Sequence, residues 1–571
     1  QLVFTQSPGP ASQAGTDSSA FTDEPIVAVE DAYANIVTSD TSQVSLSITA
    51  GTGTAGATLG QCKANPLNAS AGLAAFTACG INKPGSSYSL TATDSSDSLT
   101  SLPSAAFTIV LGSPNQLVFT TEPVVTGGTQ AGTGGSAFTN SGASDGQQPV
   151  VTIEDAAGNT LTSDTSTVTL LITSNVGPNG SVLTCSSNNV AATAGVATFS
   201  GCKINTAASG YTLTATDSSD SLPSATSSSF SIGVGLAAQL AFTTQPVTSA
   251  GAQAGTDAGA FTNSGANDGQ QPVVTIEDAG GNTVTSNTSS VTLAITSGTG
   301  PGGATLSCTS NPLAASAGVA TFSGCGINKP GSGYTLKATD GSLTSATSIN
   351  FSIGAGPATK LVFTQSPVNT AGAQAGTGGI AWSQQPIVTI EDAKGYTVTS
   401  NTSSVTLAIT SGTGLAGATL SCTPNPEPAL AGVATFSGCA INTAASGYTL
   451  TATDGSLTSA TSLSFKIAVG PASSLVFTTE PPSSTAKGSS HTFSTSVTVE
   501  DAGGNAVASS SVTLSPSGGT LVCSSNPVSS NSSGVAAFSG CYFKNSTSNG
   551  TYHLTATDGT LTAQSTNISV T

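Results

Sequence analysis

The sequence predicts an all-β chain of several β-sandwich domains in tandem. Three observations lead to this prediction: a strand- and turn-forming composition, a segment that recurs along the chain, and two cysteines in each recurrence. Thr and Val favour pleated strands, while 66 Gly and 27 Pro supply turns, and no stretch keeps a helical period. A chain of 571 residues is too long for one hydrophobic core.

The recurring segment reads Gln-Leu-Val-Phe-Thr at residue 1 and returns with small changes four times. Its five starts divide the chain into repeats 1 to 5, which are residues 1–115, 116–238, 239–359, 360–473 and 474–571. A period of this length matches one small sandwich domain and is too long for a solenoid unit.

Each repeat contains the same series of short strand patterns. In repeat 3, Val and Ile alternate before a Glu-Asp-Ala-Gly-Gly-Asn turn at 277–282, and a second alternating run covers 291–296. Further strands are expected at 318–322, 333–340 and 349–353. About seven short strands per repeat is the count of an immunoglobulin-like sandwich. The linkers are short, so we expect nearly collinear repeats that form an extended rod.

These motifs resemble those of prokaryotic immunoglobulin-like repeats. The resemblance rests on the Glu-Asp-Ala-x-Gly-Asn turn, the Gly-Val-Ala-Thr-Phe strand and the Gly-Tyr-Thr-Leu-x-Ala-Thr-Asp strand, and it covers nearly the whole chain. Such repeats occur in invasin- and intimin-type adhesins and in other large surface proteins. The resemblance implies the fold, whereas the module itself serves as spacer, adhesin tip or filament subunit.

The ten cysteines fall two to a repeat, 17 residues apart in four pairs and 18 in the fifth. An even count, strict periodicity and an exported context favour disulfides within repeats. Zinc is the alternative, but two thiolates without nearby His cannot complete a tetrahedral shell. Closing such a loop stabilises a domain by about 3 kcal/mol in the chain-entropy model. The expected pairs are Cys62/Cys79, Cys185/Cys202, Cys308/Cys325, Cys422/Cys439 and Cys523/Cys541.

These bridges do not occupy the inter-sheet positions of antibody domains. Where those domains place a cysteine, two residues after the tyrosine, this chain has Leu213, Leu336 and Leu450. We therefore expect a lateral clamp between two neighbouring segments. The tyrosines themselves are candidates for the corner hydrogen bond found in many such sandwiches.

The charge and hydropathy of the sequence argue against nucleic acid as a partner and against a membrane-spanning segment. The net charge is −18, with only ten basic residues, all Lys, so the basic footprint that nucleic-acid binding needs is absent. No apolar run reaches the length of a membrane span, and no signal peptide opens the chain. Gln1 starts directly on a strand pattern, which indicates a processed form or a fragment cut at a repeat boundary. We expect a secreted protein at a cell surface.

The acidic residues are the candidates for chemistry. Glu-Asp pairs precede each predicted turn, but neighbours on a strand face opposite sides, so each Asp more simply caps its turn. Calcium at the junctions between repeats is the alternative, because hard cations take several carboxylate oxygens. The calcium candidates are Asp155, Asp278, Asp217 and Asp340.

No enzymatic site and no cofactor are predicted. His491 and His553 both lie in repeat 5, so the first four repeats cannot pair a nucleophile with a histidine base. Trp382 is a single tryptophan and does not make a carbohydrate platform by itself. Asn-x-Ser/Thr sequons are frequent, and if the host glycosylates them they would carry sugars. They are Asn68, Asn179, Asn287, Asn350, Asn401, Asn531, Asn545, Asn549 and Asn567.

Two functions from different classes fit these features. The first is a structural filament or stalk that self-associates, either through an edge strand such as the one beginning at Gln1 or by lateral packing. The second is an adhesin that binds a glycan or a surface protein through a terminal repeat, since repeats 1 and 5 diverge most.

Overall fold

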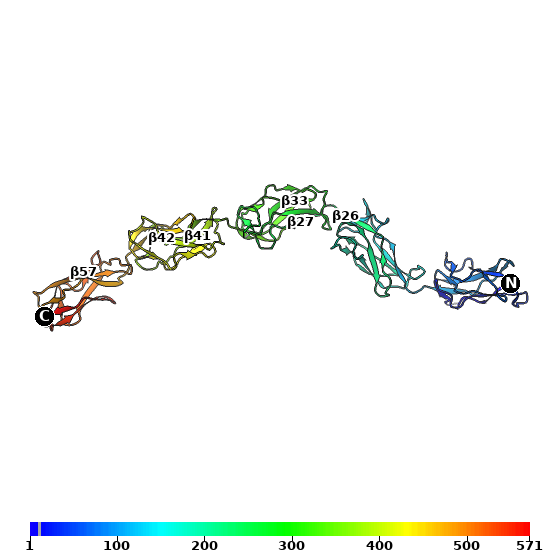
Figure 1. The fold of residues 1–571 in the computed structure, drawn as a ribbon, viewed down its shortest axis with the longest axis horizontal. Coiled ribbons are helices and arrows are strands. Elements are labelled where there is room, and N and C mark those ends of the chain that lie inside the picture. Colours follow the sequence, from blue (N-terminus) through cyan, green and yellow to red (C-terminus); the bar gives the residue numbers. More distant parts are fainter. Residues whose placement is uncertain (10–12, 266) are drawn as a thin grey trace.

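The computed structural model describes residues 1–9, 13–265 and 267–571, and within these ranges the secondary structure consists of β-strands joined by turns, without a helix. The buried side chains of the described residues form five hydrophobic clusters, and each cluster draws its members from one sequence repeat. The repeats follow one another in an extended row with the two chain ends at opposite tips (Figure 1). The chain is thus an all-β array of immunoglobulin-like sandwiches.

One sheet of each repeat contains the opening strand, which pairs antiparallel with the strand that leads into the Glu-Asp turn. In repeat 2 the register sets Leu117 opposite Ile153 and Phe119 opposite Val151, so alternate side chains point into the core. The strands of this sheet, in spatial order, are β1 (Leu2–Gln6), β3 (Ile26–Val29) and β7 (Leu73–Ala75); β13 (Gln116–Thr121), β17 (Val150–Glu154) and β21 (Val196–Thr198); β27 (Gln239–Thr244), β29 (Val273–Glu277) and β33 (Val319–Thr321); β39 (Ala358–Gln365), β41 (Ile387–Asp392) and β45 (Val433–Thr435); and β51 (Ser474–Thr479), β53 (Phe493–Glu500), β57 (Val535–Phe543) and β55 (Leu521–Val522).

A second, four-stranded sheet covers the other side of the core. Its two central strands pair antiparallel, with Leu170 opposite Ala215 in repeat 2. Its strands, in spatial order, are β6 (Leu67–Asn68), β4 (Gln43–Ile48), β10 (Leu90–Asp94) and β11 (Leu99–Thr100); β20 (Asn189–Ala191), β18 (Thr167–Ile172), β24 (Leu213–Asp217) and β25 (Ala225–Thr226); β32 (Leu313–Ala314), β30 (Ser290–Ile295), β36 (Leu336–Thr339) and β37 (Ala346–Thr347); β44 (Glu427–Pro428), β42 (Ser404–Ile409), β48 (Leu450–Thr453) and β49 (Ala460–Thr461); and β56 (Val528–Ser529), β54 (Ser511–Pro516), β59 (Leu554–Asp558) and β60 (Leu561–Gln564).

A third, mixed sheet contains the closing strand of each repeat between a parallel and an antiparallel neighbour. Its strands are β2 (Gly15–Thr16), β12 (Phe107–Val110) and β9 (Gly85–Tyr88); β14 (Gln130–Thr133), β26 (Phe230–Gly233) and β23 (Ala208–Tyr211); β28 (Gln253–Thr256), β38 (Phe351–Gly354) and β35 (Gly331–Tyr334); β40 (Ala373–Thr377), β50 (Phe465–Ala468) and β47 (Ala445–Tyr448); and β52 (Ser484–Thr485), β61 (Ile568–Val570) and β58 (Gly550–Tyr552). The strand predicted at 333–340 is divided at Thr335, because β35 belongs to this sheet and β36 to the four-stranded one.

Short two-stranded sheets complete the repeats. Four of these pairs flank the cysteines of repeats 1 to 4, and one forms a hairpin in repeat 2. They are β5 (Leu59–Gly60) with β8 (Gly80–Ile81), β19 (Leu183–Thr184) with β22 (Lys203–Ile204), β31 (Leu306–Ser307) with β34 (Gly326–Ile327), β43 (Leu420–Ser421) with β46 (Ala440–Ile441), and β15 (Asn140–Ser141) with β16 (Ser144–Asp145).

The centre of each core is aromatic. In repeat 2 the buried Tyr211 ring stacks on Phe230 with the centroids 5.9 Å apart, and Phe138 meets the same Phe230 edge-on at 5.6 Å. The Tyr211 hydroxyl donates to the Thr206 carbonyl at 3.0 Å, which is the predicted corner hydrogen bond. Tyr88, Tyr334 and Tyr448 make the same bond to a carbonyl five residues earlier. Trp382 is the counterpart of Phe138 in repeat 4, so it is a buried core residue.

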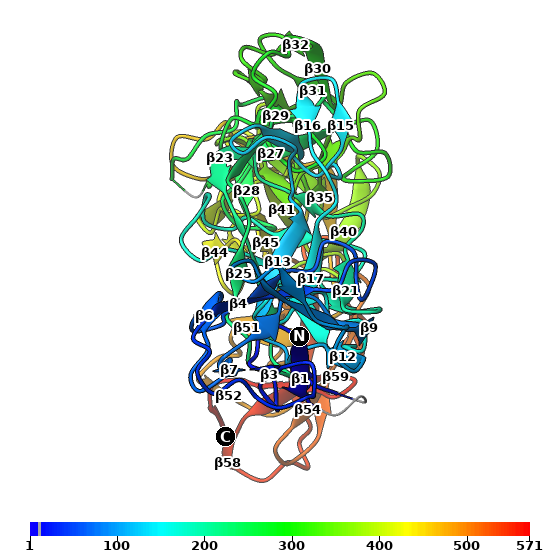
Figure 2. The ribbon, with the colours of Figure 1, turned by 90° about the vertical axis from the view of Figure 1, so that its right-hand side faces the viewer.

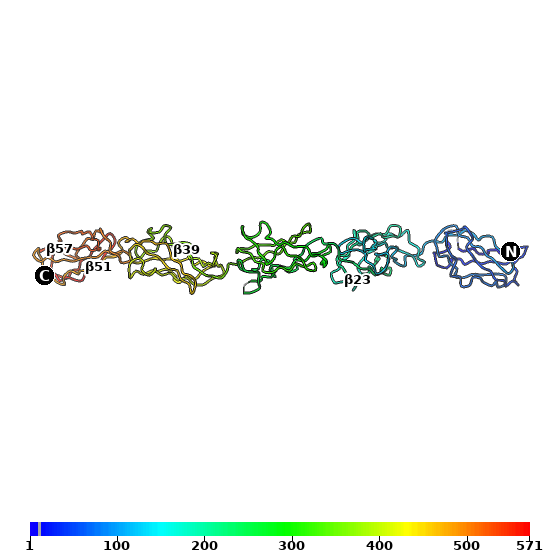
Figure 3. The backbone as a smooth tube through the Cα atoms, turned by 90° about the horizontal axis from the view of Figure 1, so that it is seen from above, coloured from blue at the N-terminus to red at the C-terminus, as the bar shows by residue number. Residues whose placement is uncertain are grey.

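The row of repeats is extended but bowed. It runs almost straight when seen from above (Figure 3), whereas a view from the N-terminal side shows the middle repeats raised above repeat 1 (Figure 2). Strand β1 pairs with β3 inside repeat 1, with Leu2 opposite Val29. Donation of the Gln1 strand to another chain is therefore not what the structure shows, because Leu2 is buried in the core of its own repeat.

Candidate functional site: the disulfides and the junctions between repeats

The structure contains five disulfides, one in each repeat. They join Cys62 to Cys79, Cys185 to Cys202, Cys308 to Cys325, Cys422 to Cys439 and Cys523 to Cys541. The second cysteine of every pair has no exposed surface and belongs to the hydrophobic cluster of its repeat. The bridge therefore clamps two adjacent segments, as predicted, but its second cysteine is part of the core, and in repeat 2 the first, Cys185, is as well.

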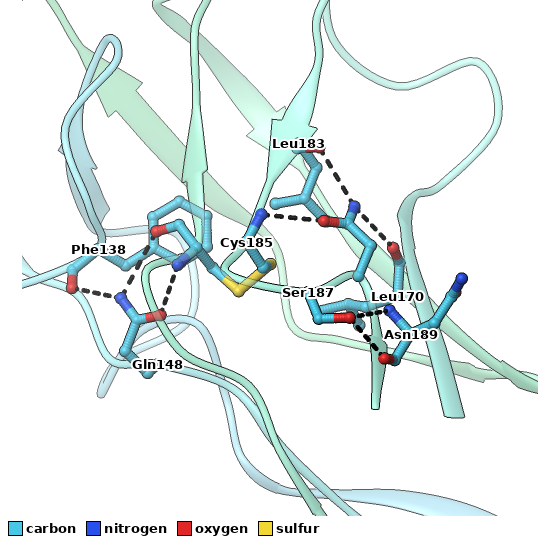
Figure 4. Close-up of a disulfide and its surroundings, with 9 residues drawn as sticks. Phe138, Gln148, Leu170, Leu183, Cys185, Ser187 and Asn189 are labelled. Atoms are coloured by element: carbon cyan, nitrogen blue, oxygen red, sulfur yellow. Dashed lines mark hydrogen bonds between the residues drawn. A yellow bond between two sulfur atoms is a disulfide. The ribbon is translucent and has the colours of Figure 1, made fainter. Parts of the chain in front are cut away.

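A glutamine side chain holds the segment around the second cysteine in repeats 2, 3 and 4. In repeat 2, Gln148 accepts a hydrogen bond from the Cys202 N–H at 2.7 Å and donates to the Phe138 carbonyl at 2.9 Å (Figure 4). Repeat 1 has Glu24 at this place, and the Cys79 N–H lies 3.2 Å from both carboxylate oxygens. These bonds satisfy polar backbone groups at the rim of the core and hold the segment that carries the second cysteine in place.

The aspartates of the Glu-Asp pairs cap five-residue turns. In repeat 3, the N–H groups of Gly280 and Asn282 donate to Asp278 Oδ1 at 2.8 and 3.0 Å. The preceding Glu277 points elsewhere and accepts from Thr275 and Gln239. The pair therefore does not act as one acidic site, and we call the segments that start at Asp31, Asp155, Asp278, Asp392 and Asp501 the Asp turns.

The second carboxylate oxygen of four Asp turns binds the linker that arrives from the previous repeat. The linker N–H donors are Gly112, Gly235, Gly356 and Gly470, which lie 3.4, 2.8, 3.0 and 2.8 Å from Oδ2 of Asp155, Asp278, Asp392 and Asp501. All four aspartates are at most 3% exposed. Since a buried carboxylate needs donors from several sides, this bond fixes the linker against the following repeat.

An asparagine at the end of the Asp turn reaches back to the previous repeat in three junctions. Asn282 Nδ2 donates to the Asn205 carbonyl at 2.8 Å, and the Ala207 N–H donates to Asn282 Oδ1 at 2.8 Å. Asn505 makes the same two bonds, to Asn442 and from Ala444, and Asn159 donates to the Asn82 carbonyl at 3.1 Å. In repeat 4 the corresponding residue is Tyr396, so this bond is missing there.

The junctions are of two kinds, which alternate along the chain. In the glycine junctions, between repeats 2 and 3 and between repeats 4 and 5, glycine from the upstream loop meets glycine from the Asp turn. A Cβ on Gly134 would overlap Asn282 Nδ2 and lie 2.8 Å from Asp278 Oδ2, and a Cβ on Gly280 would overlap the Asn205 carbonyl. Gly378 and Gly503 meet in the same way, so only glycine permits this close approach of two backbones.

In the aspartate junctions, between repeats 1 and 2 and between repeats 3 and 4, both glycines are replaced. The upstream residue becomes Asp17 or Asp257, and the Asp-turn residue opposite becomes Ala157 or Lys394. In the junction of repeats 3 and 4, Lys394 Nζ lies 2.7 Å from the buried Asp257 carboxylate. Burial by itself would raise the pKa of Asp392. Hydrogen bonds from the Tyr396, Gly356 and Lys394 N–H groups and from the Asp257 carboxyl outweigh burial, so the pKa of Asp392 is lowered.

The junction of repeats 1 and 2 has the acid pair without the lysine. Asp17 is 4% exposed and faces Asp155, and Asn159 Nδ2 donates to Asp17 Oδ2. Burial, together with the neighbouring Asp155, raises the pKa of Asp17 to about 6. Burial by itself would raise the pKa of Asp155 as well. Hydrogen bonds from the Asp17 carboxyl and from backbone N–H groups outweigh burial, so the pKa of Asp155 is lowered. The pair therefore shares a proton below about pH 6.

The structure does not bring the four calcium candidates together. Asp155 and Asp278 lie in different junctions, where their oxygens accept N–H bonds. Asp217 and Asp340 accept from the hydroxyls of Ser166 and Ser289 inside their own repeats. Within the described ranges, no group of three or more His, Cys, Asp or Glu side chains is arranged to hold a metal ion.

The remaining predicted residues are mostly at the surface. His491 lies in an exposed turn before β53, and His553 lies between β58 and β59. Seven sequon asparagines are exposed, whereas Asn287 and Asn401 are half-buried and their Oδ1 atoms accept bonds from Ser289 and Ser403. The seven exposed sequon asparagines are Asn68, Asn179, Asn350, Asn531, Asn545, Asn549 and Asn567.

The linker glycines and the alternation of the junctions were not predicted from the sequence. The available signal was a correlation between repeats: Asp17 and Asp257 go with Ala157 and Lys394, whereas Gly134 and Gly378 go with Gly280 and Gly503. Two positions that change together across repeats lie in contact in the structure.

Among the described residues, no helix has the length and hydrophobicity needed to cross a membrane. No protein-family model and no curated protein matches the sequence.

Solved structures that are similar to the chain include bacterial proteins of the type that the sequence motifs resemble. FdeC, an Escherichia coli adhesin, is 19% identical over 59% of this chain and 99% of its own, with a TM-score of 0.27. Invasin, a bacterial integrin-binding protein, is 16% identical over 80% of this chain and 79% of its own, with a TM-score of 0.26. The D00-D0 domain of intimin is 16% identical over 37% of this chain and 99% of its own, with a TM-score of 0.23. Because the identities are below 25% and the TM-scores below 0.5, these similarities assign neither ligand nor function.

Proposed function

We propose that the chain is a non-enzymatic structural segment of an extracellular stalk or filament, in which each repeat is one domain with the boundaries given above. The observation that carries the proposal is the buried hydrogen bond from a linker glycine to an Asp turn, which recurs in all four junctions. A bond of this kind fixes the direction in which one repeat follows another, which is what a spacer under load requires.

The disulfides support the same proposal. Each bridge joins two cysteines that lie 17 or 18 positions apart within one repeat. A pulling force therefore cannot extend the segment between the two cysteines of any repeat. Disulfides persist mainly in oxidising compartments, so the five bridges support a secreted location at a cell surface.

Small-angle X-ray scattering of the purified chain tests the stalk. A rigid or gently bowed rod gives a pair-distance distribution with a long tail and regular shoulders at the spacing of the repeats. A broad ensemble of bent shapes, with no shoulders, would exclude a stiff stalk.

An adhesin function for repeat 1 is the second candidate, and one cavity favours it. A hollow of about 290 Å³ lies between β1 and the segment after β11, lined by Leu2, Phe4, Leu102 and Pro103. Leu102 is 84% exposed. In repeat 3 the same place is closed by a parallel bridge in which the Leu240 N–H donates to the Thr344 carbonyl at 2.9 Å. The loop before β11 is two residues longer than its counterpart in repeat 3.

Binding to a glycan array and to a set of host surface proteins tests the adhesin. Leu102→Asp should abolish any binding that uses the hollow, whereas Leu430→Asp, at an equally exposed leucine of repeat 4, should not. Equal binding by both variants would exclude the hollow as the ligand site.

A further inference from the structure

The junction of repeats 3 and 4 brings one amine and two carboxyl groups into contact across a domain boundary. Asp257 belongs to the upstream loop of repeat 3, whereas Asp392 and Lys394 belong to the Asp turn of repeat 4. Lys394 Nζ lies 2.7 Å from Asp257 Oδ2. The two carboxyl groups also touch, because the Asp257 carboxyl donates a hydrogen bond to Asp392 and helps to lower the pKa of Asp392.

The contact between Lys394 and Asp257 differs from a hydrogen-bonded ion pair. The Asp257 side chain is 3% exposed, yet its Oδ2 atom accepts no hydrogen bond from the described part of the chain. The amine therefore does not approach this oxygen along the direction of a hydrogen bond. Because a carboxyl C–O bond is about 1.2 Å long, Nζ lies at most about 4 Å from Asp257 Cγ. This is close to the separation of about 3–3.5 Å at which a positioned nucleophile reacts.

Asp392 is placed to carry a proton between the other two groups. Its Oδ1 atom accepts N–H bonds from Lys394 and Tyr396 at 2.9 and 3.0 Å, and its Oδ2 atom accepts one from Gly356 at 3.0 Å. These donors favour the ionised form of Asp392, so Asp257 is the member of the pair that holds a shared proton. A protonated carboxyl group can be attacked by an amine, and an ionised carboxylate beside it can accept the proton that the amine loses.

We propose that Lys394 and Asp257 form an amide bond that joins repeat 3 covalently to repeat 4. In the ion pair from which the bond forms, the ammonium first passes one proton to the Asp257 carboxylate, which leaves an amine and a carboxylic acid. Nζ then attacks Asp257 Cγ, and Asp392 takes the proton that the nitrogen loses. When the tetrahedral intermediate collapses, one Cγ–O bond breaks and Asp392 returns the proton to the leaving hydroxyl. One water is released, no electron is exchanged with another reagent, and Asp392 ends in its starting form.

The placement of the three groups offsets the cost of making an amide in water. An ammonium and a carboxylate are well solvated in dilute solution, and burial removes this advantage from Asp257. Groups held in a reactive geometry act as if at an effective concentration of about 10⁵–10⁸ M. A hollow of about 270 Å³ borders Asp257, Asp392 and Lys394 and gives the released water a way out.

The other junctions lack at least one of the three groups. The junction of repeats 1 and 2 has the acid pair Asp17 and Asp155, but Ala157 stands where repeat 4 has Lys394. The two glycine junctions have glycine in place of both the upstream acid and the lysine. We therefore expect a single amide link in the chain. The link goes beyond the stalk function and does not depend on it.

Mass spectrometry of the intact chain, denatured and with its disulfides reduced, tests the proposal. We expect a mass about 18 Da below that of the sequence, and a digest that contains two peptides joined through Asp257 and Lys394. Lys394→Arg keeps the positive charge but supplies no free amine, so this variant should have the full mass. Lys360→Arg is the matched control and should keep the loss of one water, because Lys360 lies 3.6 Å from the more exposed Glu391.

Three results would contradict the proposal. A parent chain with the full mass would exclude the bond. A loss of one water that survives Lys394→Arg would show a different dehydration, such as an aspartyl succinimide, which joins no peptides. Asp392→Asn keeps an acceptor for the N–H groups but cannot take a proton, so freshly made protein should link at least about tenfold more slowly, and linking at the parent rate would exclude the role of Asp392. The scattering profile decides the stalk separately, because a rod held by hydrogen bonds alone keeps that function without the amide.

Discussion

The glycine and aspartate junctions join almost identical repeats by two different contacts. In the glycine junctions, Gly134 meets Gly280 and two backbones touch, so shape holds the repeats together. In the aspartate junctions, side chains fill the same space and charge has to be balanced, by Lys394 in one case and by a proton in the other. The bond from the linker glycine to the Asp turn is thus kept in both kinds of junction, because the two residues that face each other beside it change together.

The largest effect is expected from moving the acid into a glycine junction. Gly134→Asp places a carboxylate against Asp278 without a lysine, and its Cβ overlaps Asn282. An unpaired buried charge costs about 3–5 kcal/mol, so the junction of repeats 2 and 3 should open. Hydrogen exchange of peptides that cover Gly235 should rise to the rate of an exposed linker.

Gly302→Asp is the matched control, because a side chain at Gly302 meets no atom within 4 Å. If Gly134→Asp left the protection of the linker unchanged, close backbone approach would not be what holds this junction.

A second prediction compares an internal Asp turn with the more exposed Asp turn of repeat 1. Asp278→Ala removes the acceptor of the Gly235, Gly280 and Asn282 N–H groups and should cost about 2–3 kcal/mol, because buried donors lose their partner. Asp31→Ala removes only the turn bonds of an exposed segment and should cost much less than Asp278→Ala. Hydrogen exchange of each turn and its linker measures both values, and equal costs would show that the linker bond contributes nothing.

The third prediction removes the lysine that distinguishes the two aspartate junctions. Lys394→Met keeps the aliphatic length but leaves Asp257 and Asp392 without their cation, at a cost of about 1–2 kcal/mol. The junction of repeats 3 and 4 should then become more stable as the pH falls, like the junction of repeats 1 and 2. Lys360→Met is the control that should change little, because its partner Glu391 is more exposed than Asp257 and lies farther from the lysine, at 3.6 Å.

The smallest effect is the pH dependence of the junction of repeats 1 and 2. Because the pKa of Asp17 rises to about 6 on folding, the folded junction binds a proton that the unfolded chain has released. The contribution of Asp17 to stability falls as the pH rises from about 4 to above 6, by about 1 kcal/mol after screening is allowed for. Below about pH 4 the junction loses stability again, because the lowered pKa of Asp155 favours its ionised form in the folded state. Exchange protection of the Gly112 linker at pH 5 and pH 7 measures this difference.

Two substitutions borrowed from other junctions should abolish that dependence. Asp17→Gly copies Gly134 and removes the titrating group, and Ala157→Lys copies Lys394 and supplies a permanent cation. A pH response that survives both substitutions would have to come from another group.

The sequence was informative where the physics is local and repeated. Alternating Val and Ile predicted β17 and β29, the Asp and Gly of the turns predicted their caps, and the cysteine period predicted the five bridges. It could not show that Gly235 donates to Asp278, because the two residues are 43 positions apart and the bond exists only when one repeat is stacked on the next. Trp382 was not expected to make a carbohydrate platform by itself, and it lies in the core of repeat 4, where it takes the place of Phe138 of repeat 2.

The most direct test of the account is the distance distribution between spin labels on either side of a glycine junction. All ten cysteines are in disulfides, so Leu171→Cys in β18 and Ala294→Cys in β30, both at exposed positions, supply the reactive thiols. A rigid junction predicts one narrow distance peak that broadens in the Gly134→Asp background and stays narrow in the Gly302→Asp background. A distribution that is already broad in the parent chain, and indifferent to Gly134→Asp, would contradict the claim that the junctions hold the repeats as one rod.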